Sequence, residues 1–231
     1  MMLQENDRGK KVETLQQKLK EEHFYKGAID GVFGPNTKTA VAQFQEYEGL
    51  NSDGIAGSKT LGALGLNDPK YLFIHCSATP ENSPSWDADK IVKGHLEDRG
   101  WSRPGYSRII EYDGTIKETW ALNLADGFQA EEITNGAKGF NQVSVHVCYV
   151  GGTDQNLKTK DTRTCAQKDS ILQIVKEIIN EVPDIKILGH KQVARKGCPS
   201  FSVPKWLRKN GIAEKNIYAY DKFGTAKTLE G

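Results

Sequence analysis

The stretch 188–201 reads Leu188-Gly189-His190-Lys191-Gln192-Val193-Ala194-Arg195-Lys196-Gly197-Cys198-Pro199-Ser200-Phe201. The apolar run 185–188 predicts a short strand, so His190 falls at a strand end, where functional residues commonly lie. Pro199 disfavours helical geometry at Cys198 and favours an extended turn. In an extended segment, residues two apart project to the same side, so the Lys196 ammonium and the Cys198 thiol are expected to face one space. A histidine and a cysteine are two of the usual zinc ligands, and we expect a third elsewhere.

A second apolar run that ends in a histidine supplies the third ligand. It reads Tyr71-Leu72-Phe73-Ile74-His75-Cys76-Ser77-Ala78-Thr79 and is followed by a proline. Two strand-end histidines and one loop cysteine match the ligand count of catalytic zinc, which keeps a fourth position open for water. Each of these residues alone is more often a packed core residue. The prediction therefore depends on His75, His190 and Cys198 together, with Lys196 beside them.

Four blocks of residues resemble the motif blocks of one enzyme family. They are Phe73-Ile74-His75-Cys76-Ser77-Ala78-Thr79, Gly105-Tyr106, Val147-Cys148-Tyr149-Val150-Gly151-Gly152 and Lys196-Gly197-Cys198-Pro199-Ser200-Phe201. In this order they resemble the zinc-dependent N-acetylmuramoyl-L-alanine amidases, the superfamily of the phage lysozymes with amidase activity and of the peptidoglycan recognition proteins. The resemblance covers residues 71–212. It implies that His75, His190 and Cys198 bind Zn²⁺ and that Tyr106 and Lys196 assist catalysis.

His146 is a rival for the third ligand position. It belongs to the predicted strand 143–150, whose alternation puts His146 and Cys148 on one face and Val145 and Val147 on the other. The family carries a small residue at this position, so His146 departs from the family pattern. Because it lies in the middle of the strand rather than at its end, we expect His146 to line or support the substrate-binding pocket instead of binding zinc.

Composition and charge exclude several classes of protein. The chain has 231 residues, of which 37% are hydrophobic and 26% charged, as is ordinary for a soluble globular protein. The formal net charge of +1 argues against nucleic acid as a partner, which usually requires a strong basic excess. The sequence contains no run of about 18 apolar residues, so we expect no membrane span. Residues 1–9 lack the apolar segment of a signal peptide. The four cysteines lack the spacing of a disulfide scaffold, which favours synthesis in a reducing cytoplasm.

Residues 1–66 are predicted to form a separate small domain of three helices, followed by a linker at 67–70. Val12, Leu15 and Leu19 have helical spacing, and further helices are expected from Pro35 and from Ser58. A short repeat lies between the helices. Asp30-Gly31-Val32-Phe33-Gly34-Pro35-Asn36-Thr37 is echoed 23 positions later by Asp53-Gly54-Ile55-Ala56-Gly57-Ser58-Lys59-Thr60.

This pattern, with the segment Ala40-Val41-Ala42-Gln43-Phe44-Gln45, resembles the peptidoglycan-binding modules that accompany many cell-wall hydrolases. The resemblance implies that residues 1–66 hold the enzyme on bacterial peptidoglycan and raise the local substrate concentration. We expect Tyr25, Phe33 and Asn36 to be exposed, and they are the candidate contacts with glycan or peptide.

Residues 71–212 are predicted to form an α/β domain, with a mixed central sheet flanked by helices. Asp113-Gly114 predicts a hairpin between strands at 107–112 and 115–120. Helices are expected at 86–99, from a capping box at Thr164 to 181, and at 205–210. His95, on the first of these helices, is expected to be a surface or half-buried residue. Residues 213–231 are predicted to form a C-terminal tail.

The resemblance implies hydrolysis of the amide bond between N-acetylmuramic acid and the L-alanine of the stem peptide. Zinc would polarise the carbonyl and lower the pKa of a bound water toward about 7. Lys196 would stabilise the oxyanion, and Tyr106 would bind the carbonyl or transfer a proton.

A wall-binding module without an export signal is typical of a phage endolysin. We expect a monomer that is made in the host bacterial cytoplasm and acts on the cell wall once the membrane is breached. Two other functions stay open, namely a noncatalytic peptidoglycan-recognition protein and a zinc peptidase that cuts within the stem peptide.

Overall fold

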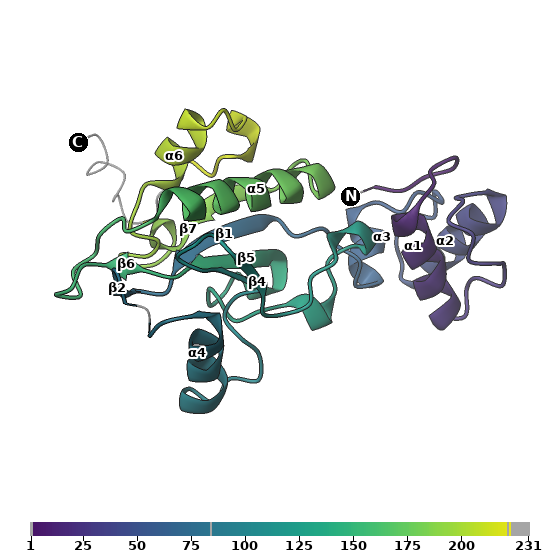
Figure 1. Ribbon diagram of the computed structural model, residues 1–231. Helices are drawn as coiled ribbons and strands as arrows, with labels where there is room; N and C mark the ends of the chain where they lie inside the picture. Colours follow the sequence, from purple (N-terminus) through teal and green to yellow (C-terminus); the bar gives the residue numbers. More distant parts are fainter. Residues whose placement is uncertain (1, 84, 221, 223–231) are drawn as a thin grey trace. The chain divides into compact units, whose positions relative to one another are not determined.

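The computed structural model describes residues 2–83, 85–220 and 222. The chain divides into two compact units, a helical unit (Met1–Asp68 with Asn123–Glu131) and a sheet unit (Pro69–Leu122 with Glu132–Gly231). Figure 1 shows helices α1, α2 and α3 in the first and the central sheet in the second. The predicted class, a mixed sheet flanked by helices and preceded by a small helical domain, is confirmed.

The helical unit is built from α1 (Lys10–Glu21), α2 (Pro35–Tyr47) and α3 (Ser58–Ala63). The three residues of α1 that have helical spacing are buried as predicted, and they pack against Ala40, Val41, Phe44, Leu61 and Leu64 in one core. Burying a large apolar side chain contributes about 1.5–3 kcal/mol, so this core holds the short helices together. The unit also contains a segment from the middle of the chain, where the Phe128 N–H donates to the Asn67 carbonyl (3.1 Å).

Two buried glutamines hold the repeated turns in the same way. Gln16 of α1 accepts a hydrogen bond from the Gly31 N–H (3.0 Å), and Gln45 of α2 accepts one from the Gly54 N–H (2.9 Å). Their side-chain amides donate to the carbonyls of Val32 and Ile55, at 3.0 and 2.9 Å. The internal repeat is therefore a turn that is clamped by a glutamine from the preceding helix.

The predicted exposure of Tyr25 and Phe33 is wrong. Tyr25 is 6% exposed, because its hydroxyl donates to the Ala28 carbonyl (2.9 Å) and lies 3.2 Å from the amide nitrogen of Gln16. Phe33 is fully buried in the core of the helical unit. A buried side chain cannot touch a polymer, so both lose their role as candidate contacts. Asn36, the second residue of α2, is exposed.

The sheet unit is organised around a sheet with the strand order β4-β3-β5-β1-β7. The strands are β1 (Tyr71–Cys76), β3 (Arg108–Ile110), β4 (Ile116–Glu118), β5 (Ser144–Tyr149) and β7 (Lys186–Gly189). Strand β5 is central and pairs in parallel with β3 and β1, and β1 pairs in parallel with β7 at the edge. Strand β4 returns antiparallel to β3, so the predicted hairpin is confirmed, with shorter strands than expected. A second small sheet joins β2 (Thr79–Pro80) to β6 (Gly152–Thr153).

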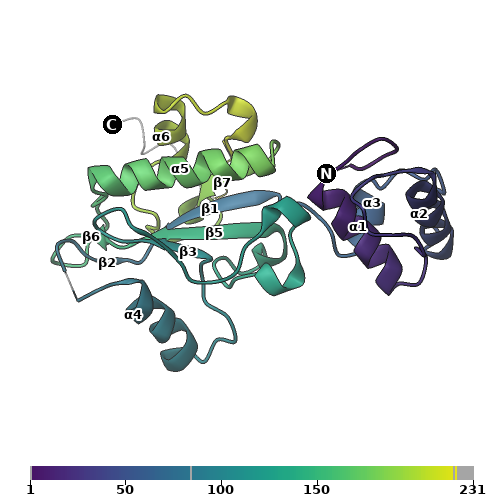
Figure 2. The same cartoon turned by 45° about the vertical axis from the view of Figure 1, so that its right-hand side comes forward.

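Helices cover both faces of the main sheet. Figures 1 and 2 show α5 (Cys165–Glu181) and α6 (Val203–Lys209) on one side of it and α4 (Ala88–Lys93) on the other. Helix α5 begins with the predicted capping box of Thr164 and Gln167. Because both faces are covered, β1 and β5 are almost continuously buried, as parallel strands usually are.

The helix predicted at 86–99 is shorter and ends irregularly. It begins at Ala88, because the Asp87 side chain accepts the Lys90 N–H as an N-cap, and it continues as the π-helical turn η1 (Gly94–Asp98). This turn buries His95, which the sequence placed at or near the surface. The His95 ring stacks on Trp101, with 5.0 Å between ring centroids.

The beginning of the predicted tail packs against the sheet unit. It contains the 3₁₀ turn η6 (Glu214–Asn216), and the Asn216 amide donates to the Ile185 carbonyl (3.0 Å). Ile217 then forms a parallel bridge with Ile187 of β7. Residues 221 and 223–231 of the predicted tail lie outside the described residues. Within the described ranges, no helix is long and apolar enough to cross a membrane.

Candidate active site

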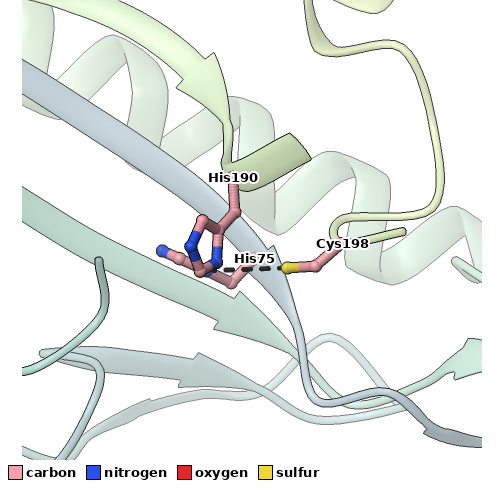
Figure 3. Close-up of side chains that lie close together, drawn as sticks. All are labelled: His75, His190 and Cys198. Carbon is pink, nitrogen blue, oxygen red and sulfur yellow. Dashed lines mark hydrogen bonds between the residues drawn. The ribbon is translucent and has the colours of Figure 1, made fainter. Parts of the chain in front are cut away.

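His75, His190 and Cys198 meet at one edge of the sheet (Figure 3). His75 lies near the end of β1, and His190 opens the 3₁₀ turn η5 (His190–Gln192) directly after β7. Because β1 and β7 are parallel neighbours, both strands deliver their histidines at the same edge. Cys198 comes from the loop before α6, and one ligand atom from each of the three residues lies within 4.8 Å of the others. The three side chains that the sequence singles out are thus brought together.

The spacing of His75 and Cys198 in this group matches that of two ligands on a tetrahedral zinc ion. A zinc with bonds of about 2.05 Å to nitrogen and about 2.3 Å to sulfur separates these two donor atoms by about 3.6 Å at the tetrahedral angle. The Nδ1 atom of His75 lies 3.6 Å from the Sγ atom of Cys198. Two imidazoles and a thiol are also donors that zinc prefers. The residues therefore fit the metal without rearrangement of this pair.

The Cys198 loop is held in place by contacts with the rest of the sheet unit. The Lys191 N–H donates to the Cys198 carbonyl (2.7 Å), and the Tyr149 hydroxyl donates to the Pro199 carbonyl (2.7 Å). Gly189 allows the close approach of this loop, since a Cβ there would lie 2.6 Å from the Cδ of Pro199. The thiol is therefore positioned before any metal binds.

Burial keeps the three candidate ligands uncharged. It lowers the pKa of His75 well below 6.5, and the rings of His146 and His190 add to this effect. Burial and the charge of Lys196 lower the pKa of His190 to about 4. Burial and the neighbouring Cys76 raise the pKa of Cys198 well above that of an ordinary thiol. At neutral pH the histidines can bind a metal at once, and the thiol must first lose its proton.

The two predicted catalytic residues lie at the same site. The Tyr106 ring centroid is 5.0 Å from that of His75. Burial, and then the neighbouring Cys148, raise the pKa of Tyr106, so its hydroxyl stays protonated and can donate a hydrogen bond. Lys196 is exposed, and its charge is close enough to lower the pKa of both candidate histidine ligands.

His146 does not line a pocket, because its side chain is fully buried. Its Nδ1 atom lies 3.1 Å from the Nε2 atom of His75, on the side of that ring away from Cys198. The predicted contact with substrate is therefore wrong, whereas the predicted support of the site agrees with this position.

Sequence reasoning missed His95. Its ring packs edge-on against Tyr106, with 5.3 Å between centroids, and its Nδ1 accepts the Gly105 N–H (3.3 Å). His95 also lines an open groove of about 330 Å³ beside the end of β1, together with Ser77, Trp86, Lys90 and Arg99. Helical periodicity places His95 on a face of its helix, but the π-helical turn that directs it toward Tyr106 has no sequence signal.

Two known protein families match parts of this chain. Residues 65–201 match the N-acetylmuramoyl-L-alanine amidase family, and residues 8–64 match a peptidoglycan binding domain family. The endolysin of Escherichia phage T7 is 34% identical over 141 residues, which cover 61% of this chain and 87% of that protein.

Other relatives resemble one part each. The spore cortex-lytic enzyme of Bacillus cereus is 48% identical over 59 residues, or 26% of this chain and 23% of that protein. The solved structure of bumblebee PGRP-SA shares the fold, with a TM-score of 0.50 at 20% identity over 67% of this chain and 89% of that chain. Because the amidase match covers more than half of the sequence, the chain belongs to the N-acetylmuramoyl-L-alanine amidase family and is a modular peptidoglycan hydrolase.

Proposed function

We propose that this amidase depends on zinc, that His75, His190 and Cys198 hold the metal, and that the protein works as an endolysin. The observation that carries the proposal is the convergence of these three donors, with the 3.6 Å separation of His75 Nδ1 and Cys198 Sγ that a tetrahedral ion requires. Three protein ligands leave a fourth position for water or substrate, which is typical of catalytic rather than structural zinc.

The residues around the ligands have separate roles in amide hydrolysis. When bound, zinc supplies a Lewis acid for the carbonyl and lowers the pKa of water. The Lys196 ammonium stabilises the negative charge that develops on the carbonyl oxygen, an effect of about 3 kcal/mol for one well-placed donor. Tyr106 is protonated and donates a hydrogen bond to the same oxygen or passes a proton to the leaving amine.

The helical unit keeps the enzyme on its polymer. Residues 8–64 match a peptidoglycan binding domain, and tethering of this kind raises the substrate concentration at the active site. Asn36 is the exposed candidate contact that remains from the sequence. Similarity to phage endolysins supports synthesis in the cytoplasm of a host bacterium, followed by action on the cell wall once the membrane is breached. The proposal includes action as a monomer.

The test compares three proteins, namely wild type, Cys198→Ala and Cys165→Ala. Wild type is expected to carry about one zinc per chain and to release stem peptides that begin with L-alanine from purified peptidoglycan. Cys198→Ala is expected to lose the zinc and the release while it still binds the wall. Cys165 is an exposed thiol at the start of α5, so Cys165→Ala controls for loss of a cysteine and should behave as wild type.

Two results would replace the proposal with another function. If wild type binds the wall and releases nothing when zinc is added, the protein is a recognition module. If mass spectrometry finds new amino termini within the stem peptide while the L-alanine amide stays intact, the protein is a zinc peptidase.

A further inference from the structure

His146 is placed to act on the metal site through His75. It lies in the middle of β5, directly opposite Phe73 of β1, and its ring centroid is 5.1 Å from that of Phe73. It is fully buried, and its Nδ1 atom is 3.1 Å from the Nε2 atom of His75. The side chain therefore contacts the ring of a candidate ligand at the nitrogen that does not face Cys198.

The two nitrogens of His75 face different partners. Nδ1 faces Cys198 Sγ, and Nε2 faces His146. In a neutral imidazole one nitrogen carries the proton and the other offers a lone pair, so a metal can bind Nδ1 only if Nε2 carries the proton. That N–H then needs an acceptor, and the acceptor within reach is Nδ1 of His146. If His146 donated instead, the proton of His75 would sit on Nδ1 and block the metal position.

This arrangement leaves His146 with a buried N–H group that lacks a hydrogen-bond partner among the described residues. Its own proton must then lie on Nε2, which is buried and has no hydrogen-bond partner among the residues that the structure describes. A buried donor without a partner costs about 1–3 kcal/mol. Packing alone would favour an apolar side chain at this position, so the imidazole points to a role beyond filling space.

The backbone around His146 is shaped for its ring. A Cβ atom at Gly136 would lie 2.4 Å from Cγ and 2.5 Å from Nδ1 of His146, and 2.7 Å from the Gly105 carbonyl oxygen. Real Cβ atoms do not approach so closely, so only glycine at position 136 leaves room for the ring. The ring is thus held between Gly136 and Phe73 with Nδ1 toward His75.

We propose that His146 is a positioning residue, which accepts the Nε2 proton of His75 and so presents the lone pair of His75 Nδ1 to the metal. Partners of this kind fix the tautomer and orientation of metal-binding histidines, and their loss typically weakens metal binding by roughly 10- to 100-fold. The inference rests on the zinc site proposed above. It adds a hydrogen-bond acceptor, His146, for the ligand His75. His146 is not itself one of the three proposed ligands.

The first test measures zinc affinity by chelator competition for wild type, His146→Phe and His146→Asn. Phenylalanine keeps a ring in the niche and removes the acceptor, whereas the side-chain oxygen of asparagine can take the place of Nδ1. We expect His146→Phe to bind zinc roughly 10- to 100-fold more weakly and His146→Asn to recover most of the loss. The visible spectrum of bound Co²⁺ should change for His146→Phe and return toward that of wild type for His146→Asn.

Gly136→Ala reaches the same contact from the other side. The backbone of Gly136 lies outside the left-handed region, so alanine can adopt its conformation, but the added Cβ displaces the His146 ring and also presses on the Gly105 carbonyl oxygen. It should weaken zinc binding although His146 is still present. Wild-type zinc affinity in both His146→Phe and Gly136→Ala would overturn the inference and leave the zinc site itself intact, whereas a wild type that binds no zinc would overturn both.

A second measurement does not depend on the folding of any variant. Long-range ¹H–¹⁵N spectra of the zinc-free wild-type protein report which nitrogen of each histidine carries its proton. We expect Nε2–H for both His75 and His146. A proton on Nδ1 of His75 would refute the inference.

Discussion

The glutamine clamp of the helical unit can be tested with Gln16→Leu. Leucine has nearly the volume of glutamine, so the change removes hydrogen bonds without opening a large cavity. The buried Gly31 N–H would lose its acceptor, at a cost of about 2 kcal/mol, and the Asp30 N–H would lose a bond worth about 1 kcal/mol. The Val32 carbonyl keeps the Gly34 N–H as a donor (2.9 Å), so it adds little. The expected loss of stability is about 3 kcal/mol, which corresponds to roughly a 100-fold change in the opening equilibrium.

Hydrogen exchange of the whole protein, read by mass spectrometry, measures this loss locally. Peptides from residues 8–64 should exchange roughly 100-fold faster in Gln16→Leu, and those from the sheet unit, called the amidase unit below, should exchange as in wild type. Gln17→Leu is the matched control, because Gln17 is the next residue of α1 and is exposed. If the two variants exchange alike, the clamp does not stabilise the turn and the estimate from its hydrogen bonds is wrong.

Three further predictions concern the amidase unit. At pH 6, zinc binding should release about one proton, from Cys198, because the histidine ligands are already neutral. Calorimetry in buffers of different ionisation enthalpy counts the released protons. A larger number would show that a histidine ligand is charged before the metal binds. The zinc-free protein should lose stability as the pH falls from 6.5 toward 4, because His190 has a pKa of about 4 in the folded state and the unfolded chain takes up the proton first. The urea midpoint of the zinc-free wild type should therefore fall more on acidification than that of His190→Asn. Lys196→Met should lower kcat on a purified muropeptide by about 100-fold without weakening zinc binding, since loss of a nearby cation cannot weaken the binding of another. A loss of zinc from Lys196→Met would instead assign Lys196 to the metal site itself.

Much of the candidate site could be predicted because its chemistry is local in sequence. His75 and His190 each end an apolar run, and such a run reports both the strand and the place where the strand stops. The pairing of β1 with β7 is not local, because 110 or more residues separate the two strands and no pattern within either names the other. The family resemblance implied only that His75 and His190 bind one metal, and the structure adds the strand pairing that brings them together.

The errors concern side chains whose burial is set by contacts that the sequence pattern does not show. Tyr25 follows a polar stretch and looks exposed, but its hydroxyl finds partners at Ala28 and at Gln16, one helix earlier. Phe33 could have been recognised, because it aligns with Ala56 in the repeat and both are fully buried. The clamping glutamines are not part of the sequence repeat, because their distances from the two turns differ. Gln16 lies 14 residues before Asp30, and Gln45 lies 8 residues before Asp53.

The buried imidazoles make the amidase unit less stable without its metal than a comparable apolar core would be. His75, His146 and His190 lie with their rings close together, and burial lowers the pKa of all three. Each must stay neutral in the folded state, and the buried Nε2 atom of His146 has no hydrogen-bond partner in the part of the chain that the structure describes. A ligand that binds only the folded state returns stability, by about 2.7 kcal/mol when its free concentration is 100 times Kd. Zinc would therefore stabilise the amidase unit as well as equip it for catalysis, and His146, which directs the lone pair of His75, links the two effects.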